Sequence, residues 1–223
     1  AEEQLAVVWS VNGLAVEGET GFSLAPGAFK KGDEVTCTLT PSDDEGEGAP
    51  VSSNVAEVLN TPPAGGAAVL APEEGTVITE FLCSAEGSTD LDGDTVDYLY
   101  SWVVDDGVIP EQTADSILGS DVGKGLTLRC RIVPFDGEDE GEEFESNDAT
   151  VANTPPTVEG AQPGPEGANG ETELVCDPVN PFDADGDELS YIYGWYVNGV
   201  LVEGESGPSL STEHFGKDDE VTC

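Results

Sequence analysis

The sequence predicts an all-β protein made of tandem β-sandwich repeats of 93 residues. Two observations support this prediction. The three tryptophans, Trp9, Trp102 and Trp195, are spaced 93 residues apart, and a constant period without insertions indicates tandem copies of one folding unit. Short stretches rich in β-branched and aromatic residues alternate with glycine, proline, asparagine and aspartate, which is typical of short strands joined by turns.

The cysteines and a linker sequence keep the same period. One cysteine series comprises Cys37, Cys130 and Cys223, and the other comprises Cys83 and Cys176. The tetrapeptide Asn-Thr-Pro-Pro begins at Asn60 and again at Asn153, and its prolines predict an extended, stiff connection. Taking this tetrapeptide as the linker, we expect three segments: 1–60 as the C-terminal part of a repeat, 61–153 as a complete repeat, and 154–223 as the N-terminal part of the next repeat.

Strand and hairpin signals are visible inside the repeats. Residues 96–104 (VDYLYSWVV) are aromatic and β-branched, and residues 191–197 alternate so that two tyrosines, a tryptophan and a valine share one face. The pairs Asn12-Gly13 and Asn198-Gly199 follow such stretches directly, and Asn-Gly between apolar runs predicts a tight hairpin turn.

A further short strand is predicted over residues 35–39 (VTCTL), and we expect Pro41 to end it because proline cannot donate to a sheet. About seven short strands per repeat, separated by turn residues every 8–12 positions or so, are typical of a β-sandwich.

The spacing of Cys83, Trp102 and Cys130 resembles the immunoglobulin-type arrangement, in which a cysteine on strand B, a tryptophan on strand C and a cysteine on strand F pack together. The sequence departs from that family at Leu128, which stands where antibody domains carry a tyrosine two residues before the second cysteine. It is therefore similar to bacterial extracellular Ig-like repeats. The run Asp-x-Asp-Gly-Asp, followed by Tyr, Trp and Asn-Gly, also resembles PKD-like and cadherin-like modules. The resemblance implies a Greek-key, Ig-like sandwich for each repeat.

The Ig-type resemblance implies two disulfides, Cys83–Cys130 and Cys176–Cys223, with the same separation of 47 residues. Cys37 occupies the Cys130 position, and its partner would fall before the first residue. A zinc site or a reactive thiol is the alternative, but zinc favours closely spaced cysteine pairs or nearby histidines, and the sequence has neither. Because disulfides persist in oxidising compartments, we expect the protein to be extracellular or displayed on a cell surface.

The charge balance excludes several classes of partner. The chain has 6 Lys and Arg against 47 Asp and Glu, for a formal net charge of −41. A nucleic-acid binder needs Lys and Arg to replace phosphate counterions, and an anionic membrane surface would repel this chain. No run of about 20 apolar residues is present to span a membrane. No signal-peptide pattern opens the sequence, so we expect such a peptide to be absent or already removed.

A small set of carboxylates repeats with the 93-residue period. Its members are Asp90, Asp92 and Asp94, which return as Asp183, Asp185 and Asp187. A glycine inside each set permits a tight turn. Three carboxylates so close together repel one another unless a cation lies among them, and oxygen ligands of this kind suit Ca²⁺. The alternative is an acidic turn that only faces water.

Further ligands are expected where the chain enters each sandwich, because the B–C and F–G loops of an Ig-like fold lie at that end. Asp136 begins the F–G loop, and Asn60 in the entering linker would add a carbonyl oxygen. Asn153 lies beside the second set, whose F–G ligand falls beyond Cys223, and Asp43 is the counterpart of Asp136 in the first segment. We therefore predict at least one Ca²⁺ per whole repeat, which would lock successive repeats at a fixed angle.

Catalysis is not expected. His214 is the single histidine, so neither Ser-His-Asp nor Cys-His chemistry has a place in every repeat. The sequence predicts a structural segment of an extracellular fibre or cell-surface stalk, whose partners are other copies of itself or further tandem repeats. Two alternatives remain open: an adhesin that binds carbohydrate or protein, with Tyr98 and Tyr100 as the best contact residues, and an accessory region of a large secreted enzyme.

Overall fold

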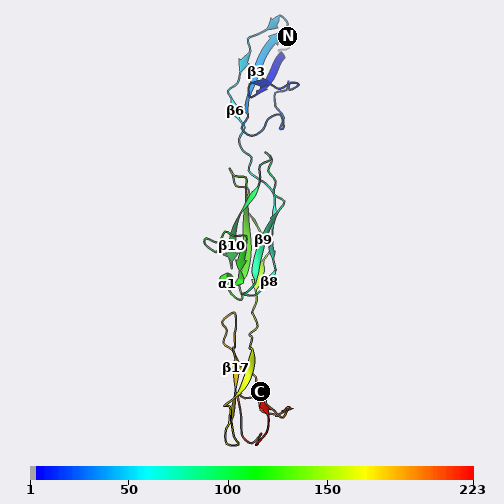
Figure 1. The fold of residues 1–223 in the computed structure, drawn as a ribbon. Coiled ribbons are helices and arrows are strands. Elements are labelled where there is room, and N and C mark those ends of the chain that lie inside the picture. The colour runs from blue at the N-terminus through cyan, green and yellow to red at the C-terminus, as the bar shows by residue number, and fades with distance from the viewer. Residues whose placement is uncertain (1–3) are drawn as a thin grey trace.

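The computed structural model describes residues 4–223 as three groups of β-sheet that follow one another along an elongated molecule (Figure 1). The N-terminus lies at one end, and the C-terminus lies near the other. The one helix in this part of the chain, α1 (Gly119–Val122), is a single turn. None of the helical structure between residues 4 and 223 is long and apolar enough to cross a bilayer. Residues 1–3 of the first predicted segment lie outside the described residues.

The first group is one six-stranded sheet. Its strands are β1 (Gln4–Val11), β2 (Leu14–Ala15), β3 (Glu34–Asp43), β4 (Gly46–Glu47), β5 (Val51–Ser52) and β6 (Ala56–Glu57). The long strands β1 and β3 are antiparallel, with Trp9 opposite Cys37. Trp9 is only half-buried, because in the described part of the chain this group has no second sheet to cover its face.

The second group is a sandwich of two sheets. One sheet has the order β11-β10-β13-β15-β8, with β14 also paired to β13, and the other has the order β12-β9-β7. The strands are β7 (Ala67–Ala71), β8 (Glu74–Gly75), β9 (Glu80–Glu86), β10 (Asp97–Val104), β11 (Gly107–Val108), β12 (Ser116–Leu118), β13 (Thr127–Phe135), β14 (Phe144–Glu145) and β15 (Ala149–Val151). All pairings are antiparallel except that of β8 with β15.

The core of the second group forms where the inner faces of the two sheets meet. Strand β13 alternates strictly between buried and half-buried residues, as expected for period-two packing. Trp102 and Phe81 are fully buried, and a disulfide joins Cys83 on β9 to Cys130 on β13. The Trp102 Nε1 group donates a hydrogen bond of 2.9 Å to the carbonyl of Ala114, which satisfies its polar atom inside the core. These features confirm the predicted all-β, Ig-like sandwich.

The third group contains two three-stranded sheets, β16-β17-β20 and β19-β18-β21. The strands are β16 (Gly160–Gly164), β17 (Leu174–Val179), β18 (Tyr196–Val197), β19 (Val200–Leu201), β20 (Ser209–Leu210) and β21 (Val221–Thr222). Trp195 is fully buried between the sheets, and a disulfide joins Cys176 to Cys223. Each of the three tryptophans donates its Nε1 hydrogen to the carbonyl twelve residues further along the chain.

The predicted Asn-Gly hairpins are formed. Asn12-Gly13 joins β1 to β2, and Asn198-Gly199 joins β18 to β19, with positive φ angles at all four residues. Two consecutive positive φ angles define the turn whose twist matches a hairpin. Asp105-Asp106 adopts the same conformation between β10 and β11, with φ angles of 44° and 68°.

The expectation that Pro41 ends its strand is wrong. Strand β3 continues to Asp43, with Pro41 opposite Leu5 of β1. The Pro41 carbonyl accepts a hydrogen bond from the N–H of Gly48, so the proline nitrogen also faces that loop and not β1. The missing N–H therefore costs the β1–β3 pairing nothing. Pro134 is in the same situation on β13, opposite Tyr98.

The strand predicted over residues 191–197 is shorter in the structure, where β18 covers only Tyr196–Val197. The corresponding strand β10 pairs over its whole length, with its first five residues opposite residues 131–135 of β13. The counterparts of residues 131–135 in the third group fall after Cys223, so residues 190–194 have no partner strand here.

The linker tetrapeptides lie between the sheet groups, within residues that form no named strand. The strands of the three groups span residues 4–57, 67–151 and 160–222, so each group lies inside one predicted segment. The segment boundaries at 60/61 and 153/154 stay predictions.

Candidate metal centre

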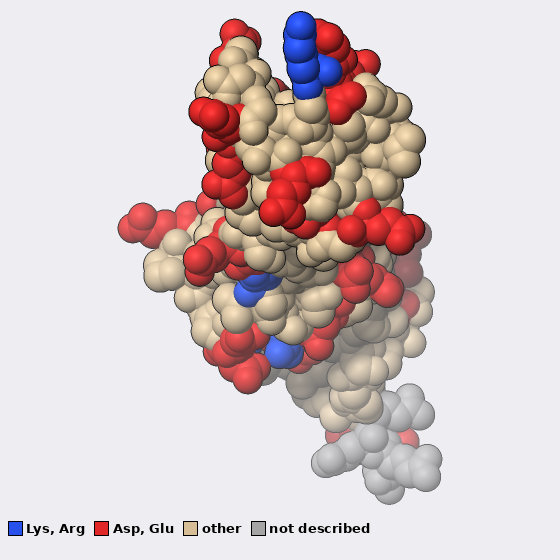
Figure 2. Space-filling model, turned by 90° about the horizontal axis from the view of Figure 1, so that it is seen from below, with Lys and Arg blue, Asp and Glu red and all other residues tan. Residues whose placement is uncertain are grey.

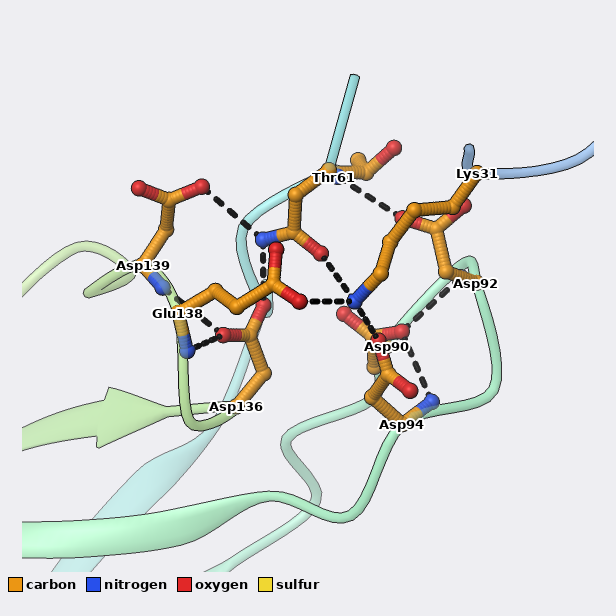
Figure 3. Close-up of polar contacts among 9 residues, drawn as sticks. Lys31, Thr61, Asp90, Asp92, Asp94, Asp136, Glu138 and Asp139 are labelled. Carbon is orange, nitrogen blue, oxygen red and sulfur yellow. Dashed lines mark hydrogen bonds and ion pairs between the residues drawn. The ribbon is translucent and has the colours of Figure 1, made fainter. Parts of the chain in front are cut away.

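The repeated carboxylates lie at the joints between sheet groups, and at the first joint four segments of chain meet (Figure 3). At the first joint these are the β9–β10 loop, the β13–β14 loop, the linker after β6 and the turn before β3. Their side chains at the joint are Asp90, Asp92 and Asp94 from the β9–β10 loop, Asp136, Glu138 and Asp139 from the β13–β14 loop, Asn60 from the linker, and Lys31 from the turn.

The first aspartate of each set shapes its own turn. Asp90 Oδ1 accepts hydrogen bonds from the backbone N–H groups of Asp92 and Asp94, at 2.8 and 3.0 Å. Asp183 makes the same two bonds in the second turn, at 2.9 and 3.0 Å. Gly93 has a φ of 86°, a left-handed conformation that glycine adopts without strain, so the loop can close this tightly.

The second aspartate of each set holds the linker backbone. Asp92 Oδ2 accepts a hydrogen bond from the N–H of Thr61 at 2.7 Å, and Asp185 Oδ2 accepts one from the N–H of Thr154 at 2.6 Å. Each threonine directly follows the linker asparagine. This bond therefore ties the entering chain to the acidic turn of the sheet group that it enters.

The third aspartate pairs with a lysine of the preceding sheet group. Lys31 Nζ lies 2.5 Å from Asp94 Oδ2, 2.9 Å from Asn60 Oδ1 and 3.0 Å from Glu138 Oε1. An ammonium group has three N–H donors, and these three oxygens can accept all of them. The hydrogen bond to Asp94, followed by that to Glu138, raises the pKa of Lys31 well above its ordinary value.

The second joint repeats this contact. Lys124 Nζ donates a hydrogen bond to Asp187 Oδ2 and lies 3.2 Å from Asn153 Oδ1. The hydrogen bond to Asp187 is also the main reason that the pKa of Lys124 is raised. Both joints therefore carry a positive charge of the protein itself beside the carboxylates that the sequence assigned to Ca²⁺.

The linker asparagine connects the lysine with the β13–β14 loop. Asn60 Nδ2 donates to Asp136 Oδ2 at 2.8 Å and to Asp139 Oδ2 at 2.9 Å. The bond from Asn60, together with backbone N–H groups of Asp139 and Glu138, lowers the pKa of Asp136 to about 2. The Asn60 side-chain oxygen, a group able to ligate a metal, accepts a hydrogen bond from Lys31.

Each joint shows a different feature that favours a metal cation beside the lysine: an unpartnered carboxylate oxygen at the first joint and a close group of three carboxylates at the second. Asp90 Oδ2 is buried and has no hydrogen-bond partner among residues 4–223. A buried carboxylate oxygen without a partner is unfavourable, and a cation would supply one. Asp183, Asp185 and Asp187 each place one carboxylate oxygen within 4.8 Å of the others, the one group of His, Cys, Asp or Glu found so close in the described chain. Clustered carboxylate oxygens are the donors that Ca²⁺ takes.

The structure thus brings most of the predicted ligands together, and their binding of Ca²⁺ stays a prediction. The first joint gathers Asp90, Asp92, Asp94, Asp136 and Asn60 in one hydrogen-bonded network. The second joint links its three aspartates to Asn153 through Lys124. Asp43 takes no part in either joint, and its Oδ1 accepts hydrogen bonds from two backbone N–H groups of its own hairpin.

The lysines at the joints were missed by the sequence patterns, although the signal is present. Lys31, Lys124 and Lys217 are spaced 93 residues apart and make up three of only six basic residues. A search for metal-ligating side chains does not select these lysines, because an ammonium group binds no metal.

On the face seen end-on in Figure 2, acidic side chains far outnumber basic ones. Arg129 and Arg131 on β13 both pair with Glu145 on β14, at 3.2 and 2.7 Å. Lys30 and Lys217 form no ion pair with any residue in the described range 4–223. Basic groups are therefore used mainly at the joints and along one strand.

Together, the fold and the joints define three consecutive groups of β-sheet with ion-paired connections, and the second group is an Ig-like β-sandwich. No protein-family model matches the chain, and no curated protein matches it.

Solved structures of similar shape include the FN1–FN3 domains of chicken CNTN1, with 9% identity, coverage of 97% of this chain and 77% of that chain, and a TM-score of 0.31. The N-terminal eight Ig domains of DSCAM isoform 1.30.30 share 16% identity over 91% of this chain and 25% of that chain, with a TM-score of 0.32. A Ca²⁺-stabilized adhesin that helps an Antarctic bacterium bind ice shares 14% identity over 90% of this chain and 54% of that chain, with a TM-score of 0.33. The chain spans about a quarter of the second and about half of the third. Because all three TM-scores are low, the fold assignment rests on the sheets and cores described above.

Proposed function

We propose that this chain is a structural segment of an extracellular fibre or cell-surface stalk, in which Ig-like units are held at fixed angles by their joints. The observation that carries the proposal is the repetition of the joint contacts: Lys31 to Asp94 and Asn60 at the first joint, and Lys124 to Asp187 and Asn153 at the second. A spacer needs the same geometry between successive units, whereas a single binding or catalytic module does not.

Two further observations support a structural role over a binding or catalytic one. Tyr98 and Tyr100, which would have favoured a glycan- or protein-binding face, are half-buried and pack against the core of the second group. His214, the single histidine, lies 3.1 Å from Glu205 within the third group and away from either joint. The partners that fit this role are further repeats of the same kind, in one chain or in neighbouring copies. The disulfides in the second and third groups support a location outside the cell.

Calcium is part of the same proposal. The first joint would hold Ca²⁺ with Asp90, Asp92 and Asp94, and Asp136 lies on the facing loop. Asp183, Asp185 and Asp187 would hold it at the second joint. The ion would supply positive charge that lets the three carboxylates stay together, and it would reduce repulsion along a rod with a net charge of −41. The buried, unpartnered Asp90 Oδ2 is the observation that favours this site.

The test is thermal unfolding of the wild type and of the double variant Asp90→Asn/Asp183→Asn, with Ca²⁺ and with a chelator. Asparagine keeps the Oδ1 acceptor that shapes each turn and removes the charge. At a Ca²⁺ concentration about 100 times Kd, each site should add about 2.7 kcal/mol to the wild type, and the variant should lose this gain.

Asp43→Asn is the matched control, because Asp43 shapes its turn in the same way outside both joints. It should respond to Ca²⁺ like the wild type. A wild-type melting temperature that does not change between Ca²⁺ and chelator would contradict the calcium proposal.

A further inference from the structure

We propose that Lys31 and Lys124 are built-in cations that latch each sheet group onto the next, and that they compete with Ca²⁺ for the same carboxylates. The latch itself follows from contacts within the chain. The competition rests on the proposed calcium site, so the experiment below separates the two.

Backbone hydrogen bonds present each lysine to its joint. The N–H of Gly32 donates to the carbonyl of Val58 at 2.8 Å, and the N–H of Val58 donates to the carbonyl of Asp33 at 2.9 Å. Gly125 donates in the same way to Val151, at 2.7 Å. The turn that carries each lysine is therefore hydrogen-bonded to the outgoing chain two residues before the linker asparagine. This anchoring limits the conformational entropy that the lysine loses when it pairs.

The lysine contacts cross the joint. Lys31 and Asp94 are 63 residues apart in sequence and belong to different sheet groups, and Lys124 and Asp187 are separated by the same distance. The side chains of Lys31 and Asp94 are 27% and 37% exposed, so water and salt reach the pair only in part. Rotation of one group against the next would break the contacts of Lys31 with Asp94 and Glu138 together, which is what makes the lysine a latch.

The ammonium also restricts what a metal can bind. Lys31 already contacts Asp94 Oδ2 and Asn60 Oδ1, two groups that a Ca²⁺ ion in the turn would use or approach. Two cations a few ångströms apart repel each other, so removal of the lysine charge should raise the Ca²⁺ affinity of each joint roughly fivefold or more. One ammonium cannot neutralise the six carboxylates around the first joint, which leaves charge for a second cation.

The remaining lysines provide a matched control. Lys30 is adjacent to Lys31 in sequence, and Lys217 keeps the 93-residue period, yet neither forms an ion pair within residues 4–223. The variants Lys31→Gln/Lys124→Gln and Lys30→Gln/Lys217→Gln both remove two positive charges from the chain. Any difference between them therefore reports on the joints and not on net charge.

The first arm measures small-angle X-ray scattering of the intact chain in chelator at low salt, with circular dichroism melts to show that each variant folds. We expect Lys31→Gln/Lys124→Gln to give a broader distribution of interatomic distances and a smaller radius of gyration than the wild type. The control pair should match the wild type, and Lys31→Arg/Lys124→Arg should recover most of the wild-type profile. Identical profiles for the latch and control variants would overturn the latch.

The second arm titrates CaCl₂ into the same proteins by calorimetry. Roughly fivefold or tighter binding by the latch variant than by the control variant supports the competition. Equal Ca²⁺ affinities of the latch and control variants would overturn the competition. The latch would then be decided by the scattering measurement alone. If CaCl₂ produces no binding heat with any of the proteins, the calcium site is refuted. The scattering measured in chelator still decides whether the lysines hold the joints.

Discussion

Removal of the disulfide of the second sheet group should destabilise that sandwich by about 4 kcal/mol. The change is Cys83→Ala together with Cys130→Ala, which opens a loop whose ends are 47 residues apart. On the chain-entropy relation, a loop of this length contributes about 4 kcal/mol by restricting the unfolded chain. Both cysteines are buried in the core, at 2% and 0% exposure, so the lost sulfur contacts add to this cost. Single domains have only about 5–15 kcal/mol of stability in total.

The assay is thermal and urea unfolding of the wild type and the double variant. With about 4–8 °C per kcal/mol for a domain of this size, Tm should fall by roughly 16–32 °C. Cys37→Ala is the control, because Cys37 is a free, half-buried cysteine and its replacement should leave the transition of the second group unchanged. A loss below about 1 kcal/mol, or alkylation of Cys83 in folded, unreduced protein, would refute the reasoning.

Two other predictions concern the joints. Gly141→Ala should weaken the first joint, because a Cβ at Gly141 would lie 2.2 Å from the carbonyl oxygen of Pro63 in the linker. We expect a loss of about 1–3 kcal/mol in the free energy of unfolding and a broadened scattering profile. Gly160→Ala is the control and should change neither quantity, because a Cβ at Gly160 meets nothing within 4 Å. Lowering the pH should loosen the first joint between about pH 4 and 2. The pKa of Asp136 is lowered to about 2 in the folded protein, against about 4 in the unfolded chain. Its contribution to stability is therefore fully present above about pH 4 and is lost as the pH falls through the folded pKa. The raised pKa of Lys31 keeps its contribution fully present below the unfolded lysine pKa of about 10.4, so scattering should stay constant from about pH 5 to 9.

The fold could be predicted because its determinants are local and repeated. Asn12-Gly13 and Asn198-Gly199 encode their hairpins in two residues, since Asn and Gly accept the positive φ angles that the turn requires. Trp102 lies on β10 and Trp195 directly precedes β18, and both are fully buried. Pro41 misled the prediction because its nitrogen faces away from β1, so the missing N–H removes no hydrogen bond of the long β1–β3 pairing. Sequence alone does not say which side of the strand that nitrogen faces.

The candidate site could be predicted only in part. The spacing of Asp90, Asp92 and Asp94 predicts a tight acidic turn, and the structure forms this turn with Gly93 at a positive φ angle. The separate roles of the three aspartates could not be predicted, because they depend on which backbone N–H groups and which ammonium group lie near each carboxylate in the folded joint. Lys31 reaches Asp94 across 63 residues of sequence, and only the arrangement of consecutive groups makes that contact.

The most direct test of the central claim is whether adjacent groups reorient independently. Backbone N–H residual dipolar couplings, measured by NMR in Ca²⁺ for residues 67–151 and 160–222, report the orientation of the second and third groups separately. If the joints hold the units at a fixed angle, one alignment tensor should fit both sets of couplings. Two tensors of clearly different magnitude would show that the groups move independently, and that result would contradict a rigid stalk.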